Sequence, residues 1–224
     1  MPAAATVDDL DLGQVYRDAR ERITELLRGA PEAMLATTVE ACPAWTVHDV
    51  VAHLVAVAED VLAGRLTGPP DDAHTAGQVE RRRGRPTDEI LDEWTGLAPP
   101  FEELLTGVRI WPGALDVLTH EQDIRGAIGA PGARETDGVI VGTHYLLTHL
   151  APPEPLRIVI DGERFDVGGE DPTTEVRTTT FEAFRFRLGR RSRAQMAAME
   201  WTGDSTRYLD HLSIFPPSVT DIVE

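Results

Sequence analysis

The sequence predicts an α+β protein in which an N-terminal helical bundle precedes a small α/β domain. Before residue 150, apolar residues recur roughly every three to four positions, which is the period of amphipathic helices. The segment Ala151-Pro-Pro-Glu-Pro ends that pattern. After it, short apolar or alternating stretches are separated by turn residues, which is typical of strands. We therefore expect a helical domain over residues 1–150 and a small α/β domain over 151–224.

Helix signals are clearest at the second helix, where Thr46 is expected to cap and Asp49 to complete a capping box. Residues 30–41 are expected to be loosely helical. Pro99-Pro100 is expected to interrupt the third helix. The last helix is apolar nearly all round, which predicts a central place in the bundle. The expected helices cover residues 10–28, 46–64, 87–105, 116–125 and 137–150.

The C-terminal part is expected to fold as a small sheet with two helices. Asp161-Gly162 predicts a hairpin turn between two strands, because both residue types tolerate the left-handed conformation of tight turns. The expected strands cover residues 156–160, 164–167 and 174–180 and a stretch near 199–204, and the expected helices cover 181–188 and 208–215.

The stretch Asp116-Val-Leu-Thr-His120-Glu-Gln-Asp123 carries the main functional signal. At about 100° per residue, Asp116, His120 and Asp123 fall on one stripe of a helix. A carboxylate and an imidazole four residues apart face the same way and can bind one metal ion. The alternative is a solvated helix face with ordinary charge pairs, of which Glu121 and Arg125 would be one.

A second histidine, His53, favours the metal hypothesis. It lies on the border of the apolar stripe of the second helix, far upstream of His120. A histidine in that position can instead be a hydrogen-bonded core residue. Nearby, the segment Gly77–Arg85 carries four arginines and is expected to form a solvated face or a helix that borders a cleft.

Composition excludes several classes of function. A net charge of −17 argues against nucleic acid or anionic membranes as partners. All 21 basic residues are arginine, so neither a lysine Schiff base nor a phosphate-loop lysine is available. The only cysteine, Cys42, rules out an intrachain disulfide and is expected to be a small packed residue in a turn. Without a signal peptide or membrane span in the sequence, we expect a cytoplasmic protein.

Two segments resemble known signatures. Cys42-Pro-Ala-Trp-Thr-Val-His-Asp-Val-Val-Ala-His53-Leu is similar to the second-helix signature of the mycothiol-dependent maleylpyruvate isomerase family. Asp116-x-x-x-His120-Glu-Gln-Asp-Ile-Arg-x-Ala-x-Gly is similar to a second signature, found in actinobacterial members. The resemblance spans nearly the whole chain. It implies a DinB-like four-helix bundle followed by a small α/β, sterol-carrier-like domain.

The resemblance also implies a site. A divalent metal, usually zinc, would be held by His53, Asp116 and His120. The family pattern has glutamate where this chain has Asp116, which is one methylene shorter and leaves the reaction open. Other metals, such as nickel or iron(II), also suit two histidines and a carboxylate. The thiol would come from mycothiol, because a bound cation favours thiolate and Cys42 is the only thiol of the chain.

Three further residues are expected to act at the site. Asp123 would support a metal ligand or face the substrate. Arg190 and Arg191 belong to a cationic cluster of the C-terminal part, and at least one is expected to bind substrate or mycothiol at the metal cleft. Alternatively, these arginines only offset an acidic surface.

We therefore expect a metal-dependent, mycothiol-using enzyme, either an isomerase or a thiol S-transferase, that acts on a small electrophilic substrate. Its partners would be that substrate and a low-molecular-weight thiol, and the chain would be a monomer or homodimer. Two alternatives stay open: a non-catalytic module that binds metal or a small ligand, and a hydrolase that uses metal-bound water without mycothiol.

Overall fold

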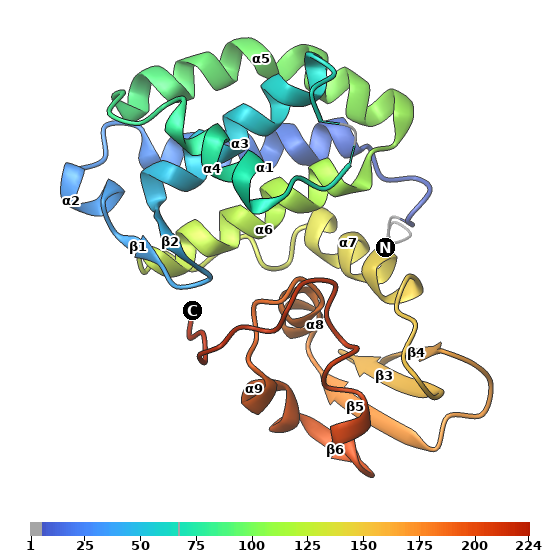
Figure 1. Ribbon diagram of the computed structural model, residues 1–224. Helices are drawn as coiled ribbons and strands as arrows, with labels where there is room; N and C mark the ends of the chain where they lie inside the picture. Colours follow the sequence, from blue (N-terminus) through green and yellow to red (C-terminus); the bar gives the residue numbers. More distant parts are fainter. Residues whose placement is uncertain (1–5, 67) are drawn as a thin grey trace. The chain divides into compact units, whose positions relative to one another are not determined.

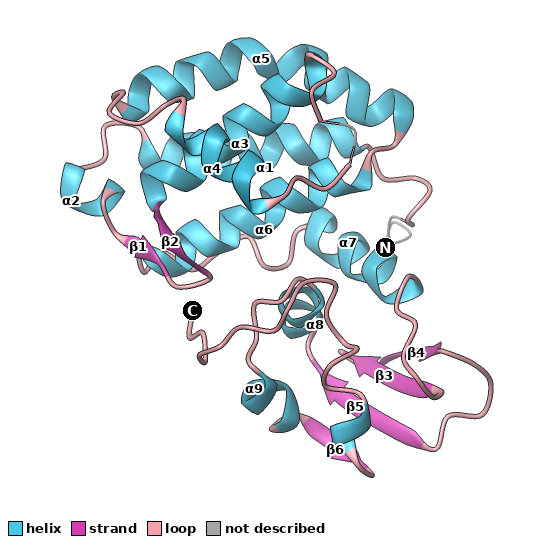
Figure 2. Ribbon diagram, in the orientation of Figure 1, coloured by secondary structure: helices cyan, strands magenta, loops and turns pink. Residues whose placement is uncertain are grey.

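The computed structural model describes residues 6–66 and 68–224, and the fold is α+β, as predicted. The chain divides into two compact units (Figure 1). We call Asp11–Gly132 the helical unit and Ala133–Val223 the sheet unit. Figure 2 shows that helices dominate the first unit and that strands β3 to β6 lie in the second. None of the described helices is long and apolar enough to cross a membrane.

The helical unit is a four-helix bundle. Its four long helices are α1 (Leu12–Leu27), α3 (Val47–Leu62), α5 (Thr87–Val108) and α6 (Trp111–Ala127). Each apolar stripe turns inward, and the fully buried residues include Leu12, Ile23, Leu54, Ile90, Trp94, Phe101, Val117 and Ile124. Both α1 and α3 pack against α5 and α6, so the two helices that carry the functional signal, α3 and α6, are neighbours.

The start of α3 follows the predicted capping box. Thr46 Oγ1 accepts a hydrogen bond from Asp49 N at 3.3 Å, and Asp49 Oδ2 accepts one from Thr46 N at 2.9 Å. These reciprocal bonds satisfy backbone donors that the first helical turn leaves without partners. They therefore set where α3 begins and which of its residues face the bundle.

The predicted interruption of α5 at Pro99-Pro100 is wrong. The helix runs through both prolines. Each proline removes a backbone donor and crowds the preceding turn, which disfavours a helix. On both sides of the pair, however, Trp94, Ala98 and Phe101 are fully buried. Packing of this continuous apolar face outweighs the local cost.

A small two-stranded ribbon before α3 was not predicted from the sequence. Residues 30–41 were expected to be loosely helical, but only α2 (Glu32–Leu35) is a helix there. β1 (Thr38–Val39) and β2 (Cys42–Thr46) pair antiparallel. Cys42 therefore lies in a strand rather than in the predicted turn. Between α3 and α5, the unit also contains α4 (Asp72–Glu80).

The sheet unit is built on four strands in the order β4-β3-β5-β6. β3 and β5 are parallel and the other pairs are antiparallel. The predicted hairpin turn is confirmed, with φ of 49° at Asp161 and 92° at Gly162. The elements are α7 (Asp137–Thr148), β3 (Leu156–Ile160), β4 (Glu163–Val167), β5 (Thr174–Thr178), α8 (Thr180–Arg187), α9 (Arg193–Ala197) and β6 (Glu200–Thr202).

Two expectations for this part of the chain are wrong. The helix over 137–150 is not central in the bundle, because α7 packs against α8 and β4, and Leu147 and Leu150 join the core of the sheet unit. The helix expected over 208–215 does not form; a short 3₁₀ turn, Ser205–Arg207, is followed by further turns. There, Arg187 donates a hydrogen bond to Leu212 O and accepts one from Ile214 N, which replaces the helical pattern.

Candidate metal centre

Three potential ligands converge between α3 and α6. His53 Nε2 lies 3.7 Å from Asp116 Oδ1, and His120 Nε2 lies 3.6 Å from the same oxygen. The ligand atoms of the three residues all lie within 4.8 Å of one another. The two histidine side chains are 5% and 6% exposed and Asp116 is 29% exposed, so the group is accessible mainly from the carboxylate.

These distances fit a small divalent cation. Two ligands at about 2.1 Å from a tetrahedral metal lie roughly 3.4 Å apart, so the observed separations need only a small contraction. Two imidazole nitrogens and one carboxylate oxygen are donors that zinc, nickel and iron(II) all accept. The donor set therefore suits a divalent transition metal but does not select one.

The alternative of a solvated helix face is wrong for α6. His120, Glu121, Gln122 and Asp123 are all buried. Glu121 pairs with Arg125 at 3.0 Å, as expected, but its carboxylate also accepts two hydrogen bonds from Arg22 of α1, at 2.8 and 2.6 Å. A buried carboxylate held by two guanidinium groups links helices and is not an ordinary surface pair.

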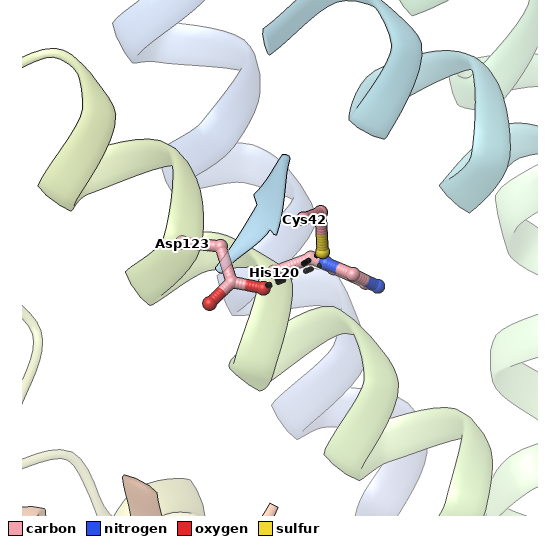
Figure 3. Close-up of side chains that lie close together, drawn as sticks. All are labelled: Cys42, His120 and Asp123. Atoms are coloured by element: carbon pink, nitrogen blue, oxygen red, sulfur yellow. Dashed lines mark hydrogen bonds and ion pairs between the residues drawn. The ribbon is translucent and has the colours of Figure 1, made fainter. Parts of the chain in front are cut away.

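Asp123 contacts the Nδ1 nitrogen of His120, whereas Nε2 of the same ring faces Asp116. His120 Nδ1 is 3.0 Å from Asp123 Oδ2, and the Asp123 side chain is fully buried (Figure 3). A carboxylate accepts the proton of Nδ1, which leaves the lone pair on Nε2, the nitrogen that faces Asp116. This geometry favours the first of the two roles expected for Asp123, support of a ligand.

Cys42 approaches the same carboxylate. Its Sγ lies 4.0 Å from Asp123 Oδ2, and Figure 3 shows the side chains of Cys42, His120 and Asp123 close together. Cys42, His120 and Asp123 form a second group whose potential ligand atoms lie within 4.8 Å. The cysteine is half-buried, and its expected role as a small packed residue stays a prediction.

Trp45 was not expected to lie at the site. Its ring centroid lies 4.8 Å from that of His53 and 6.1 Å from that of His120. The two imidazoles lie edge to face at 5.2 Å. Trp45 immediately precedes the cap residue Thr46, a position where an apolar residue often packs back on the helix. That signal could have placed the indole near α3, but not over the histidines.

Gln78 was also missed. Its Oε1 lies 2.9 Å from His53 Nδ1, and both side chains are buried. Each histidine of the group therefore has one ring nitrogen hydrogen-bonded to a buried acceptor and the other directed at Asp116. Hydrogen-bonded support of this kind is typical of metal-binding histidines.

Arg190 and Arg191 belong to the sheet unit. Arg191 binds Glu182 at 2.6 and 2.7 Å, and Arg190 donates to Leu188 O at 2.8 Å. Burial would raise the pKa of Glu182, but the hydrogen bonds from Arg191 outweigh it and lower that pKa. That either arginine reaches the metal centre stays a prediction.

Comparisons with known proteins bear on this geometry. Residues 16–125 match the model of the mycothiol maleylpyruvate isomerase N-terminal domain. The match covers nearly all of the helical unit, including His53, Asp116 and His120. Residues 16–125 therefore belong to this domain family.

Solved structures of the mycothiol-dependent maleylpyruvate isomerase share the fold. One has a TM-score of 0.56 at 14% identity, and a variant of that enzyme has 0.62 at 12%. Each comparison covers 91% of this chain and 98% of the other. At such low identity, the likeness to the isomerase structures shows the fold alone. A comparison with curated proteins finds no significant match.

Proposed function

We propose that this protein is a metal-dependent enzyme that uses mycothiol to act on a small electrophilic substrate. The convergence of His53, Asp116 and His120 on one point, with both histidines supported from behind, carries the proposal. Membership of the mycothiol maleylpyruvate isomerase family supports the thiol. Zinc is the metal that we propose first, since two histidines and a carboxylate are a usual zinc set.

Three protein ligands leave coordination positions for other molecules, which is typical of catalytic rather than structural sites. The metal, when bound, would favour the thiolate form of mycothiol and hold it near the substrate. The chain itself would hold a proton on His120 Nδ1 through Asp123 and keep water from both imidazoles with the Trp45 ring. These roles keep the two Nε2 lone pairs available as ligands.

The reaction that we propose is reversible addition of the thiolate to an electron-poor double bond, followed by rotation and thiolate release, which isomerises the substrate. The alternative reaction is transfer of mycothiol to an electrophile, in which the thiol adduct is not broken down and is itself the product. The shorter Asp116, where the family pattern has glutamate, is the reason to keep both. We propose that Arg190 or Arg191 binds an anionic group of the substrate or of mycothiol, and that the enzyme works in the cytoplasm.

The test compares the full-length chain with and without metal and mycothiol. Turnover is measured on maleylpyruvate and on a thiol-reactive electrophile. We expect turnover only with both additions, loss of turnover in His53→Ala, and activity close to wild type in His48→Ala. His48 is a suitable control because it lies on the same helix, is half-buried and binds Thr87 at 2.8 Å, outside the candidate site.

Other outcomes would overturn the proposal in different ways. Metal-dependent turnover in thiol-free buffer would favour a hydrolase that uses metal-bound water. Tight metal binding without turnover under any condition would favour a binding module. Thiol-dependent turnover that survives in His53→Ala would mean that the chemistry takes place elsewhere.

A further inference from the structure

A chain of buried polar contacts runs from His53 away from the candidate metal. His53 Nδ1 lies 2.9 Å from Gln78 Oε1, and Gln78 Nε2 donates to Asp60 Oδ2 at 2.8 Å. The three side chains come from the middle of α3, from α4 and from the last turn of α3. Gln78 and Asp60 are fully buried. Their contacts are therefore made in a region of low dielectric constant, where hydrogen bonds are strong.

Asp60 is held by cationic and neutral donors on all sides. Arg65 and Arg81 each donate to Oδ1 at 2.8 Å, and His74 Nε2 lies 2.8 Å from Oδ2. Burial would raise the pKa of Asp60, but the hydrogen bonds from Gln78 and the residues around it outweigh burial and place that pKa well below its ordinary value. The carboxylate is therefore ionised at neutral pH.

The ionised Asp60 carboxylate determines which group donates and which accepts in the hydrogen bonds that connect it to His53. A carboxylate only accepts hydrogen bonds, so Gln78 must turn its NH₂ group towards Asp60. The amide oxygen then faces His53, and only a proton on Nδ1 can satisfy it. The lone pair of the imidazole consequently lies on Nε2, the nitrogen that faces Asp116.

We propose that Gln78 and Asp60 are positioning residues that set the tautomer of His53 and keep its Nε2 available as a ligand. The inference rests on the proposed role of His53 at the metal. A reversed amide would offer N–H to Nδ1, place the imidazole proton on Nε2 and block that ligand. Asp60 prevents the reversal, because it has no proton to offer the amide oxygen.

The arginine-rich segment, residues 77–85, forms ion pairs with the acidic residues around Asp60, which was not predicted from the sequence. Residues 77–85 were expected to be a solvated face or to border a cleft. Instead Arg81 binds Asp60, and Arg82 is 2% exposed and bridges Glu59 to Glu93. Arg82 would hold α4 against its neighbours whether or not the tautomer matters. The test must therefore separate tautomer control from simple packing.

The experiment reads the tautomer of His53 directly by nitrogen NMR of its ring in the metal-free, full-length protein. It is paired with competitive zinc titration. In the wild type we expect the proton on Nδ1. Asp60→Asn can accept or donate towards Gln78, so we expect a mixture of tautomers and zinc affinity about 10–100-fold lower.

Glu59→Gln is the matched control. It makes the same change of charge at the adjacent position and loses ion pairs with Arg65 and Arg82, but Glu59 does not bind Gln78. We expect the wild-type tautomer and an affinity within about 2-fold. Gln78→Met provides a second test, because it keeps the volume of the side chain and removes the acceptor. It should give mixed tautomers in a folded protein.

The proposal is overturned if folded Asp60→Asn and Gln78→Met both keep the proton on Nδ1 and bind zinc like the wild type. It is also overturned if Glu59→Gln shifts the tautomer as much as Asp60→Asn, since packing alone would then explain the effect. The wild type could carry the proton on Nδ1, and Asp60→Asn could shift it, while the protein binds no metal. That result would support control of the tautomer and contradict the proposed function instead.

Discussion

The two sides of the His120 ring present two groups of potential ligands. On the Nε2 side lie His53 and Asp116, and on the Nδ1 side lie Asp123 and Cys42. In both groups the potential ligand atoms lie within 4.8 Å of one another. By proximity alone, either group can hold a metal ion.

The hydrogen bonds distinguish the two groups. On the Nδ1 side, Asp123 Oδ2 lies 3.0 Å from the ring nitrogen, a distance that a shared proton explains. On the Nε2 side, the nearest carboxylate oxygen lies 3.6 Å away, too far for a direct hydrogen bond and suited to an intervening cation. A nitrogen that carries a proton is not a ligand, so the position of one proton favours His53, Asp116 and His120 as the proposed metal ligands and Asp123 as the support of His120.

Removal of the shared ring should have the largest effect. His120→Ala deletes a proposed ligand and removes the imidazole that contacts both Asp116 and Asp123. We expect metal content to fall from about one ion per chain to nearly none, as measured by elemental analysis. His149→Ala, an exposed histidine of the sheet unit, is the control. Equal metal content in wild type and His53→Ala/His120→Ala would mean that the site is misplaced.

Asp116→Asn should come next. The amide is a poorer ligand than the carboxylate and leaves zinc with a net charge of about +2 rather than +1 in a site of neutral histidines. We expect affinity for zinc to fall by at least about 10–100-fold, since substitution of residues that only hydrogen-bond to the ligands already costs that much. Competitive titration with a chromogenic chelator measures it. Unchanged affinity would remove Asp116 from the ligand set.

Asp123→Asn tests the supporting side of the ring. Asparagine can present its NH₂ group to Nδ1, which would move the imidazole proton to Nε2 and block the ligand. We expect zinc affinity to fall by about 10-fold with little change in fold. Nitrogen NMR of the His120 ring should show the change of tautomer. If affinity falls while the tautomer stays as in wild type, Asp123 acts by another route.

The support behind His53 predicts a dependence of the folding stability on pH. The pKa of Asp60 is lower in the folded protein than its ordinary value of about 3.9, so folding keeps this group deprotonated. The stabilisation is present above about pH 4 and is lost as pH falls below that value. Unfolding by denaturant at about pH 7 and pH 3 should show a smaller loss in Asp60→Asn than in wild type. An equal loss would contradict the assignment.

Cys42→Ser should have the smallest effect. The thiol touches Asp123 at 4.0 Å, a weak contact that serine can replace. We expect zinc affinity to change by less than about 2-fold and thiol-dependent turnover to persist, because the reacting thiol would be mycothiol. A loss of affinity similar to that of Asp116→Asn would place Cys42 among the ligands.

Much of the candidate metal centre could be predicted from the sequence, because the positions of its residues depend on patterns within a single helix. A capping box sets the start of α3, and the helical period places Asp116 and His120 on one face of α6. The burial of Asp123 behind His120 follows from the same period, since the two residues are three positions apart.

The rest depends on packing between elements that are distant in sequence. Gln78 meets His53 only because α4 packs on α3, and no periodicity in either segment encodes that pairing. The apolar residues of α7 suit any core, so the sequence placed this helix in the bundle, whereas it packs on α8. Pro99 and Pro100 stayed helical for the same reason: burial overrode a local preference.

X-ray absorption at the metal edge of the zinc-loaded, full-length protein tests the central claim most directly. With zinc bound at the Nε2 side, we expect only nitrogen and oxygen neighbours, at about 2.0–2.1 Å, and an unchanged spectrum in Cys42→Ser. A sulfur neighbour at about 2.3 Å that disappears in Cys42→Ser would show that the metal binds on the Nδ1 side of His120 and would contradict the account.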